Sequence, residues 1–303
     1  MHTIRIATRK SKLALWQAHF IKDQLEQTVD GLVVEIVGMS TAGDRWLDKP
    51  LSEVGGKGLF IKELEVAMLE GRADIAVHSM KDLPALLPDQ FTLAAVGYRA
   101  AVHDTLVGAA SLDELPAGAV IGSSSLRRAS QLLAARPDLQ VAPIRGNVDT
   151  RLAKLENGEY DAIVLAQAGL DRLQLQLGAH GMLPLTLSLP AAGQGALGIE
   201  CVADSPAEQL VSVLNDPAVS RCVAAERGVS AGLGADCSAP LAAHAVVLPD
   251  SGSLSLSARL GVPDGSRLLS AQVSGDDPLQ LAQQAVQDLM AQGAQDVLQQ
   301  LAH

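Results

Sequence analysis

An acidic residue, Asp82, follows a strand-like segment and stands between a lysine and a turn. Residues 73–77 have the apolar character of a buried strand, and the run His78-Ser79-Met80-Lys81-Asp82-Leu83-Pro84 comes directly after it. An exposed Lys81–Asp82 pair, or a simple turn before proline, is the plainer explanation when Asp82 is considered alone. The carboxyl ends of strands in α/β sheets are, however, where ligands and chemistry collect. A carboxylate there could stabilise positive charge and pass protons.

Five arginines stand at predicted strand-to-helix corners: Arg9, Arg127, Arg128, Arg145 and Arg151. The segment Gly122-Ser123-Ser124-Ser125-Leu126-Arg127-Arg128 follows a strand and opens a helix, so hydroxyl, backbone N–H and guanidinium groups can converge on an anion. The segment 143–151, which contains Gly146, repeats this arrangement. Solubility or helix capping explains any single arginine better than ligand binding does, but it does not explain the shared placement.

The arginines favour a ligand with several separate anionic groups, because guanidinium stays protonated and pairs bidentately with carboxylate or phosphate. A nucleotide fits less well. The run Gly55-Gly56-Lys57-Gly58 lacks the P-loop spacing and the hydroxyl residue after lysine, and no G-x-G-x-x-G follows a strand. We interpret this run as a mobile loop or helix entry, with Lys57 as a further positive charge. His78 has no obvious partner and is interpreted as structural.

The three cysteines, Cys201, Cys222 and Cys237, have neither the number nor the spacing of a disulfide framework or a zinc site, so no metal is predicted. Cys201 lies in an apolar run and Cys222 in a predicted helix, where small buried residues are expected. Cys237 lies in a loop with glycines before it and a proline after it. That context gives weak support for a reactive thiol, because Asp236 disfavours the thiolate.

The elements that would position these residues alternate between strands and helices. Strands are predicted at 4–7, 33–37, 73–77, 120–121, 141–144 and 162–165. The segment Gly71–Val77 resembles Gly158–Val164, and Ile6–Ser11 resembles Ile121–Ser125. These repeats predict an α/β fold of two similar lobes with parallel or mixed sheets.

Two crossovers, near 96–103 and 189–193, predict a hinge between the lobes and a ligand cleft at their interface. The predicted division is 1–97 with 193–216 for the first lobe, 98–192 for the second lobe, and 217–303 for a small α+β domain. In this last domain we expect a helix over 218–227 that ends at Gly228, then strands around 243–247, 254–260 and 268–273, and one final helix over 278–301.

Composition narrows the class of protein. The net charge of −11 argues against a general nucleic-acid binder, which would show a basic face. No apolar run reaches the roughly 20 residues of a membrane-spanning helix, and no signal-peptide h-region precedes the first strand. We therefore expect a cytoplasmic protein that does not bind membranes.

The chain resembles the porphobilinogen deaminase (hydroxymethylbilane synthase) family over nearly its whole length. The matching strings include Arg5–Arg9, Leu13–Ala18, Gly55–Phe60, His78–Pro84, Ser124–Arg128, Arg145–Asn147, Gln194–Ala196 and the Cys237 loop. Each string is weakly specific, but their order and spacing together are strong evidence. The resemblance implies a periplasmic-binding-protein-like pair of hinged lobes followed by a C-terminal domain that carries a cofactor.

The resemblance also implies an activity and a set of roles. The enzyme would join four porphobilinogen molecules head to tail, release ammonia at each addition, and liberate hydroxymethylbilane for tetrapyrrole synthesis. Cys237 would hold a dipyrromethane cofactor through a thioether, and Asp82 would be the catalytic carboxylate. The residues implied for binding cofactor and substrate are Arg9, Ser11, Lys57, Phe60, Ser79, Lys81, Ser123, Ser125, Arg127, Arg128, Arg145, Gly146, Arg151 and Gln194. A monomer is expected, because the family is usually monomeric.

The sequence departs from the family pattern at two places. Ala235-Asp236 precede Cys237 where paired glycines are frequent, which could alter cofactor loading, and Lys12 stands where proline is frequent. The main alternative is a non-catalytic, two-lobed binding protein for an anionic small molecule, because a fold does not prove a function. A transcriptional effector domain is a third possibility, although the sequence has no convincing helix-turn-helix or basic element.

Overall fold

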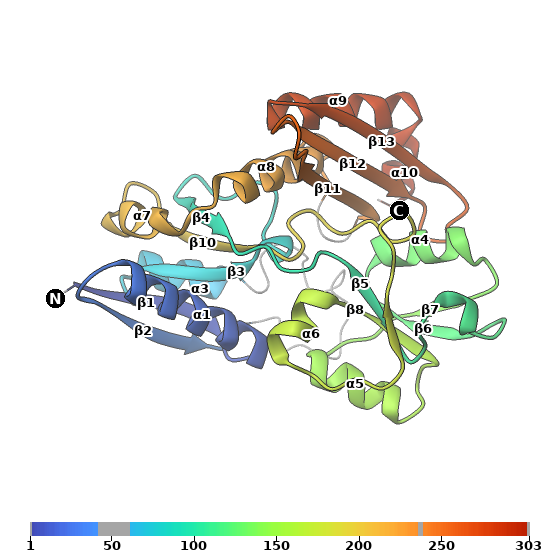
Figure 1. The fold of residues 1–303 in the computed structure, drawn as a ribbon, viewed down its shortest axis with the longest axis horizontal. Coiled ribbons are helices and arrows are strands. Elements are labelled where there is room, and N and C mark those ends of the chain that lie inside the picture. Colours follow the sequence, from blue (N-terminus) through green and yellow to red (C-terminus); the bar gives the residue numbers. More distant parts are fainter. Residues whose placement is uncertain (1, 42–60, 236–238, 302–303) are drawn as a thin grey trace. The chain divides into compact units, whose positions relative to one another are not determined.

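The computed structural model describes residues 2–41, 61–235 and 239–301 (Figure 1). The chain forms two compact units, one of residues 1–100 with 195–220 and the other of residues 101–194 with 221–303. The described residues of these units form two mixed five-stranded sheets and one three-stranded sheet. The predicted fold class, two similar α/β lobes and a small α+β domain, is confirmed. The predicted boundaries of three separate domains stay a prediction.

The first unit is built on a five-stranded sheet with the order β2-β1-β3-β10-β4. Its strands are β1 (His2–Arg9), β2 (Leu32–Met39), β3 (Ile75–Ser79), β4 (Phe91–Gly97) and β10 (Leu197–Val202). The strand β1 is parallel to β2 and β3, whereas β10 is antiparallel to β3 and β4. The helical segments are α1 (Lys12–Thr28), α3 (Lys62–Leu69), α7 (Pro206–Val211) and the 3₁₀ turns η1 (Met80–Asp82) and η3 (Ser212–Leu214).

Helices cover both faces of this sheet, which explains why its strands are apolar without strict alternation. Ile6 and Ile75 pack in one core cluster with α1, and the adjacent residues Ala7 and Ala76 pack in another with Leu64 of α3. Both neighbours in β1, Ile6 and Ala7, are fully buried. The result is a rigid sheet whose carboxyl edge carries Arg9 and Ser79.

The second unit contains a sheet with the order β7-β6-β8-β5-β9. Its strands are β5 (Asp104–Val107), β6 (Val120–Gly122), β7 (Gln140–Ala142), β8 (Ala162–Ala166) and β9 (His180–Met182). The helical segments around it are η2 (Leu112–Glu114), α4 (Leu126–Ala135), α5 (Val148–Glu156) and α6 (Gln167–Leu173). The strand β6 is parallel to β7 and β8, whereas β5 is antiparallel to β8 and β9. This is the same pattern of pairing as in the first sheet.

The repeated segments of the sequence lie at equivalent places in the two sheets. The backbone N–H of Asp74 donates to the carbonyl of Arg5, and its carboxylate accepts from the Arg5 N–H at 2.8 Å. The backbone N–H of Asp161 donates to the carbonyl of Val120, and its carboxylate accepts from the Val120 N–H at 2.7 Å. Each aspartate thereby fixes two parallel strands at the point where their pairing begins.

The C-terminal residues form an antiparallel meander, β11 (Leu241–Val247), β12 (Leu254–Gly261) and β13 (Leu268–Gly275). The helices of this region are α8 (Pro217–Gly232), α9 (Pro278–Ala291) and α10 (Ala294–Leu301). Buried residues of β11, β12, β13, α8 and α9 share one core cluster. Within the second unit, Arg259 of β12 donates to Gln131 of α4 at 3.1 Å.

Two helix predictions in this region were wrong, and glycine explains both. The helix predicted to end at Gly228 continues to Gly232, because Gly228 is a packing position: a Cβ there would lie 2.5 Å from the Cβ of Ala282 in α9. The single final helix is two helices, because the chain turns at Gly293 with a φ of +94°, a value that favours glycine.

Candidate active site

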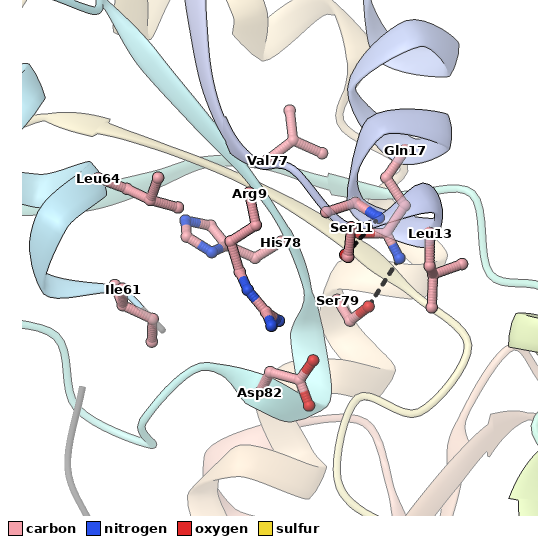
Figure 2. Close-up of a pocket in the computed structure, with 11 residues that line it drawn as sticks. Arg9, Ser11, Leu13, Gln17, Ile61, Leu64, Val77, His78, Ser79 and Asp82 are labelled. Carbon is pink, nitrogen blue, oxygen red and sulfur yellow. Dashed lines mark hydrogen bonds between the residues drawn. The ribbon is translucent and has the colours of Figure 1, made fainter. Parts of the chain in front are cut away.

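A pocket lies in the first unit at the carboxyl ends of β1 and β3 (Figure 2). These parallel strands are neighbours, so residues that follow them share one edge of the sheet. The residues that line the pocket are Arg9, Ser11, Leu13, Ala14, Gln17, Ile61, Leu64, Val77, His78, Ser79 and Asp82. Four predicted site residues, Arg9, Ser11, Ser79 and Asp82, are therefore brought together.

Two hydroxyl groups of the pocket are held by local contacts. Ser11 is the N-cap of α1, and its Oγ accepts from the Ala14 N–H at 3.3 Å. Lys12 therefore occupies the first helical position. Ser79 Oγ accepts from Nε2 of the buried Gln17 at 2.7 Å, which leaves the Ser79 hydroxyl proton available as a donor. Gln17 was not identified from the sequence.

Asp82 ends the 3₁₀ turn η1, which follows β3 directly. The turn is fixed at its start by Met80, whose N–H donates to the carbonyl of Ala196 at 3.0 Å. Asp82 itself is exposed, and Figure 2 shows the guanidinium of Arg9 directed toward its carboxylate. The pocket thus places a cation and an accessible anion at its rim.

His78 lines the same pocket and has a partner, so the interpretation that it lacks one was wrong. Its Nε2 lies 2.9 Å from Oε2 of Glu200 in β10, and the side chains are 6% and 0% exposed. The antiparallel pairing of β3 with β10 brings these residues together across 122 positions of sequence.

In the second unit, the serines between β6 and α4 form local hydrogen bonds. Ser125 is the N-cap of α4 and accepts from the Arg128 N–H at 3.4 Å, and Ser123 Oγ accepts from the Ser125 N–H at 3.3 Å. Ser124 differs, because its Oγ donates to the carbonyl of Ile144 and accepts from the Ile144 N–H. Ser124 thus ties the two arginine-bearing segments together.

Arg127 and Arg128 share a buried carboxylate, Asp104, which sequence reasoning missed. Arg127 Nη1 donates to Asp104 Oδ2 and Arg128 Nη2 donates to Oδ1, both at 2.7 Å. Ser188 Oγ and Gln194 Nε2 add hydrogen bonds of 2.8 and 3.1 Å to the same group. Burial alone would raise the pKa of Asp104, but the charges and hydrogen bonds of the two arginines outweigh it and hold that pKa well below its usual range.

Because two guanidinium groups face one carboxylate, this buried cluster keeps an excess positive charge at the start of α4. Such an excess favours an anionic ligand there. Both arginines also donate to backbone carbonyls, Arg127 Nη1 to Leu189 at 2.7 Å and Arg128 Nη1 to Val164 at 2.9 Å. Gln194, a predicted binding residue, is fully buried and also donates to the carbonyl of Val102 at 2.6 Å.

Arg145 and Gly146 lie between β7 and α5, and Arg151 lies within α5. Arg151 Nε donates to the carbonyl of Gly146 at 2.8 Å. Gly146 has a φ of +112°, and a Cβ there would lie 2.7 Å from the side chain of Thr150, so the turn requires glycine. Arg145 and Arg151 are both half-buried.

Three predicted site residues, Lys57, Phe60 and Cys237, lie outside the described residues. Cys201 and Cys222 are buried, as the sequence predicted, and burial raises the pKa of the Cys201 thiol. Within 2–41, 61–235 and 239–301, no helix combines the length and apolar character needed to cross a membrane.

The fold and these groups define a two-lobed α/β protein that carries arginine and serine side chains at strand-to-helix corners in each lobe and an accessible carboxylate in the first. Comparison with known proteins specifies the family. Residues 4–209 match the model "Porphobilinogen deaminase, dipyromethane cofactor binding domain", and residues 220–291 match "Porphobilinogen deaminase, C-terminal domain".

Curated relatives agree over nearly the full length. A porphobilinogen deaminase of Burkholderia vietnamiensis is 51% identical over 307 residues, covering 99% of this chain and 92% of that one. A porphobilinogen deaminase of Nitrosomonas europaea is 51% identical over 304 residues, covering 99% and 98%. Among solved structures, an ancestral cationic amino acid solute binding protein aligns with a TM-score of 0.45 and 16% identity, over 70% of this chain and 87% of that one.

The chain belongs to the porphobilinogen deaminase family. It is an enzyme, a transferase of tetrapyrrole biosynthesis, and its cofactor is a dipyrromethane. The predicted family, reaction class and cofactor are confirmed.

Proposed function

We propose that the pocket at β1 and β3 is where this enzyme handles the pyrrole cations of its reaction. The enzyme joins four porphobilinogen molecules head to tail, releasing ammonia at each addition and hydroxymethylbilane at the end. The observation that best supports this role is that Arg9 and Asp82 line the same pocket, at the carboxyl edge of a sheet.

The donor groups suit the acidic arms of pyrroles. Guanidinium and hydroxyl groups bind carboxylates through charge-assisted hydrogen bonds, and the first unit offers Arg9, Ser11 and Ser79 for this purpose. Arg127, Arg128, Arg145, Arg151, Ser123 and Ser125 are the corresponding candidates in the second unit. We assign both sets to binding the carboxylates of substrate and cofactor, with Lys57, Phe60, Lys81, Gly146 and Gln194 in support.

Asp82 has the position needed to stabilise a cation. A carboxylate about 4 Å from a unit positive charge contributes roughly 1 kcal/mol in water and roughly 4 kcal/mol where the effective dielectric constant is near 20. Asp82 is exposed in this structure, so its effect on a pyrrole cation depends on the ligand displacing water from the pocket. We assign Asp82 to assisting loss of the substrate amine and to stabilising the cationic pyrrole on either side of C–C bond formation.

The cofactor supplies, when bound, the pyrrole carbon to which the first substrate molecule is joined. We propose Cys237 as its attachment residue, through a thioether. The described cysteines support this choice, because Cys201 and Cys222 are both buried. The arginine and serine donors described above fit its carboxylate arms.

We propose that the protein is a cytoplasmic monomer that binds neither nucleic acid nor membranes. The net charge of −11 supports the absence of nucleic-acid binding. We also propose three domains with the boundaries given above.

Intact-protein mass spectrometry tests the attachment. The protein as purified should carry the added mass of a dipyrromethane, and peptide mapping should place it at Cys237. The variant Cys237→Ser should lack both the mass and the activity, whereas Cys222→Ser should keep both. An unmodified wild-type protein that still forms hydroxymethylbilane from porphobilinogen would refute the assignment.

A further inference from the structure

His78 and Glu200 form a buried pair in the wall of the pocket that contains Asp82. The imidazole of His78 lies between Leu64 and Arg9 in the view of Figure 2, and its Nε2 is 2.9 Å from Glu200 Oε2. Nothing in the assignments above gives either residue a role in the reaction.

The hydrogen bond sets the tautomer of the imidazole. An ionised carboxylate only accepts hydrogen bonds, so Nε2 of His78 carries the proton that faces Glu200. In the neutral ring, Nδ1 then has a free lone pair. A carboxylate that orients an imidazole in this way also stabilises the imidazolium that forms when the ring accepts a proton.

Glu200 brings a buried negative charge to this pair. Glu200 is 0% exposed, and among the described residues its Oε1 has no hydrogen-bond partner. A buried carboxylate beside a neutral ring is costly, whereas a proton on His78 converts the two groups into a neutral ion pair. Glu65 of α3 belongs to the same cluster, because burial and the charge of Glu200 raise the pKa of Glu65.

The reaction needs a proton acceptor at each addition. When the free α-carbon of one pyrrole attacks the methylene carbon of the next, the attacking ring becomes cationic and must lose its α-proton to regain aromaticity. If Asp82 took this proton, its carboxylate would be neutral when the next cationic pyrrole forms. A second acceptor keeps Asp82 ionised from one addition to the next.

On the basis of the proposed function, we propose that His78, oriented by Glu200, is the proton acceptor of this pocket. The α-C–H bond of the attacking ring breaks, its electron pair returns to the ring, and the proton moves to Nδ1 of His78. The imidazolium pairs with Glu200 and then releases its proton to water, which restores the neutral ring for the next addition. Glu200 is a positioning residue in this scheme.

The first test compares His78→Gln with His244→Gln. A glutamine at position 78 can still donate to Glu200 but cannot take up the proton. His244 offers a matched control, because it also lies on a strand beside a fully buried glutamate, with Nδ1 3.4 Å from Glu226 Oε1. Turnover should fall by roughly 100-fold or more in His78→Gln and stay unchanged in His244→Gln. Thermal melting curves verify that both variants are folded.

Isotope and pH measurements separate a catalytic role from a structural one. Porphobilinogen deuterated at its free α-carbon should show a larger isotope effect in His78→Gln than in the wild type, because proton loss becomes rate-limiting. The fall in kcat at acid pH that His78 causes should disappear in this variant. The charged groups around His78 are Glu200, Glu65, Arg9 and Asp82. The pH profile of Asp82→Asn identifies any fall in kcat at acid pH that is caused by the Asp82 carboxylate instead.

Glu200→Gln gives a readout that does not depend on turnover. Histidine-selective NMR of the purified protein, with the His78 signal assigned by its loss in His78→Gln, should show Nε2 as the protonated ring nitrogen of His78, and the ring-nitrogen shifts should change in Glu200→Gln. Unchanged His78 ring-nitrogen shifts in Glu200→Gln, or an unchanged isotope effect and pH profile in His78→Gln, would overturn the inference. A wild-type protein that forms no product would instead refute the proposed function.

Discussion

Replacing Asp104 by asparagine should strongly destabilise the second unit. The substitution keeps the shape of the side chain but leaves the buried guanidinium groups of Arg127 and Arg128 facing a neutral amide. Breaking a buried ion pair by removing one partner costs about 3–5 kcal/mol, because an uncompensated charge stays buried. For a unit of this size, that cost corresponds to a fall in Tm of about 10 °C.

Asp138→Asn is the control. Its pair with Arg136 has the same N–O separation of 2.7 Å, but Asp138 is 40% exposed whereas Asp104 is 0% exposed. Exposed pairs contribute little, so the Tm of Asp138→Asn should stay near that of the wild type. Differential scanning calorimetry of the two variants, purified in the same way, gives the comparison. Equal and small changes in Tm for the two variants would refute the reasoning that burial makes the Asp104 cluster important.

Three further predictions follow from the same structure. Folding lowers the pKa of Asp104, so its ionised carboxylate stabilises the folded protein fully above the pKa of an unfolded aspartate, and this stabilisation is lost as pH falls through the folded pKa. The Tm difference between wild type and Asp104→Asn should therefore shrink below about pH 4. A Tm difference that stays constant with pH would contradict this. Gly228→Ala should lower the free energy of unfolding by about 1–3 kcal/mol in urea titrations, because the new Cβ meets Ala282, whereas Gly178→Ala, with open space around it, should have no such effect. Arg145→Gln should slow cofactor assembly or chain extension, seen by mass spectrometry as less loaded protein or as stalled oligopyrrole adducts, and normal loading and product formation would count against the anion-binding assignment.

The sequence was sufficient for the features that depend on local pattern. Apolar runs located β1, β3 and β8. The repeat around Asp74 and Asp161 predicted two similar sheets, and in the structure both aspartates fix strand pairs in the same way. The hydroxyl before a helix, as at Ser11, also has a purely local signal.

The contacts that sequence reasoning missed join residues far apart in the chain. Glu200 reaches His78 across 122 positions because β10 crosses back into the first sheet, and Ser188 reaches Asp104 across 84 positions. No local pattern marks these pairs. An acidic residue at the start of a strand, such as Asp104, becomes a signal only when two arginines elsewhere are known to need a buried anion. Gly228 shows the opposite difficulty, since the same residue type serves helix ends and close helix packing.

The most direct test of the central claim is the turnover of Asp82→Asn with porphobilinogen, measured as ammonia release and hydroxymethylbilane formation. The variant should fold normally and bind pyrroles, because Asp82 is exposed and Arg9, Ser11 and Ser79 are retained. Its turnover should fall by about fivefold to about a thousandfold, as the loss of roughly 1–4 kcal/mol of charge stabilisation requires. Turnover at the wild-type rate in a correctly loaded Asp82→Asn protein would contradict the account.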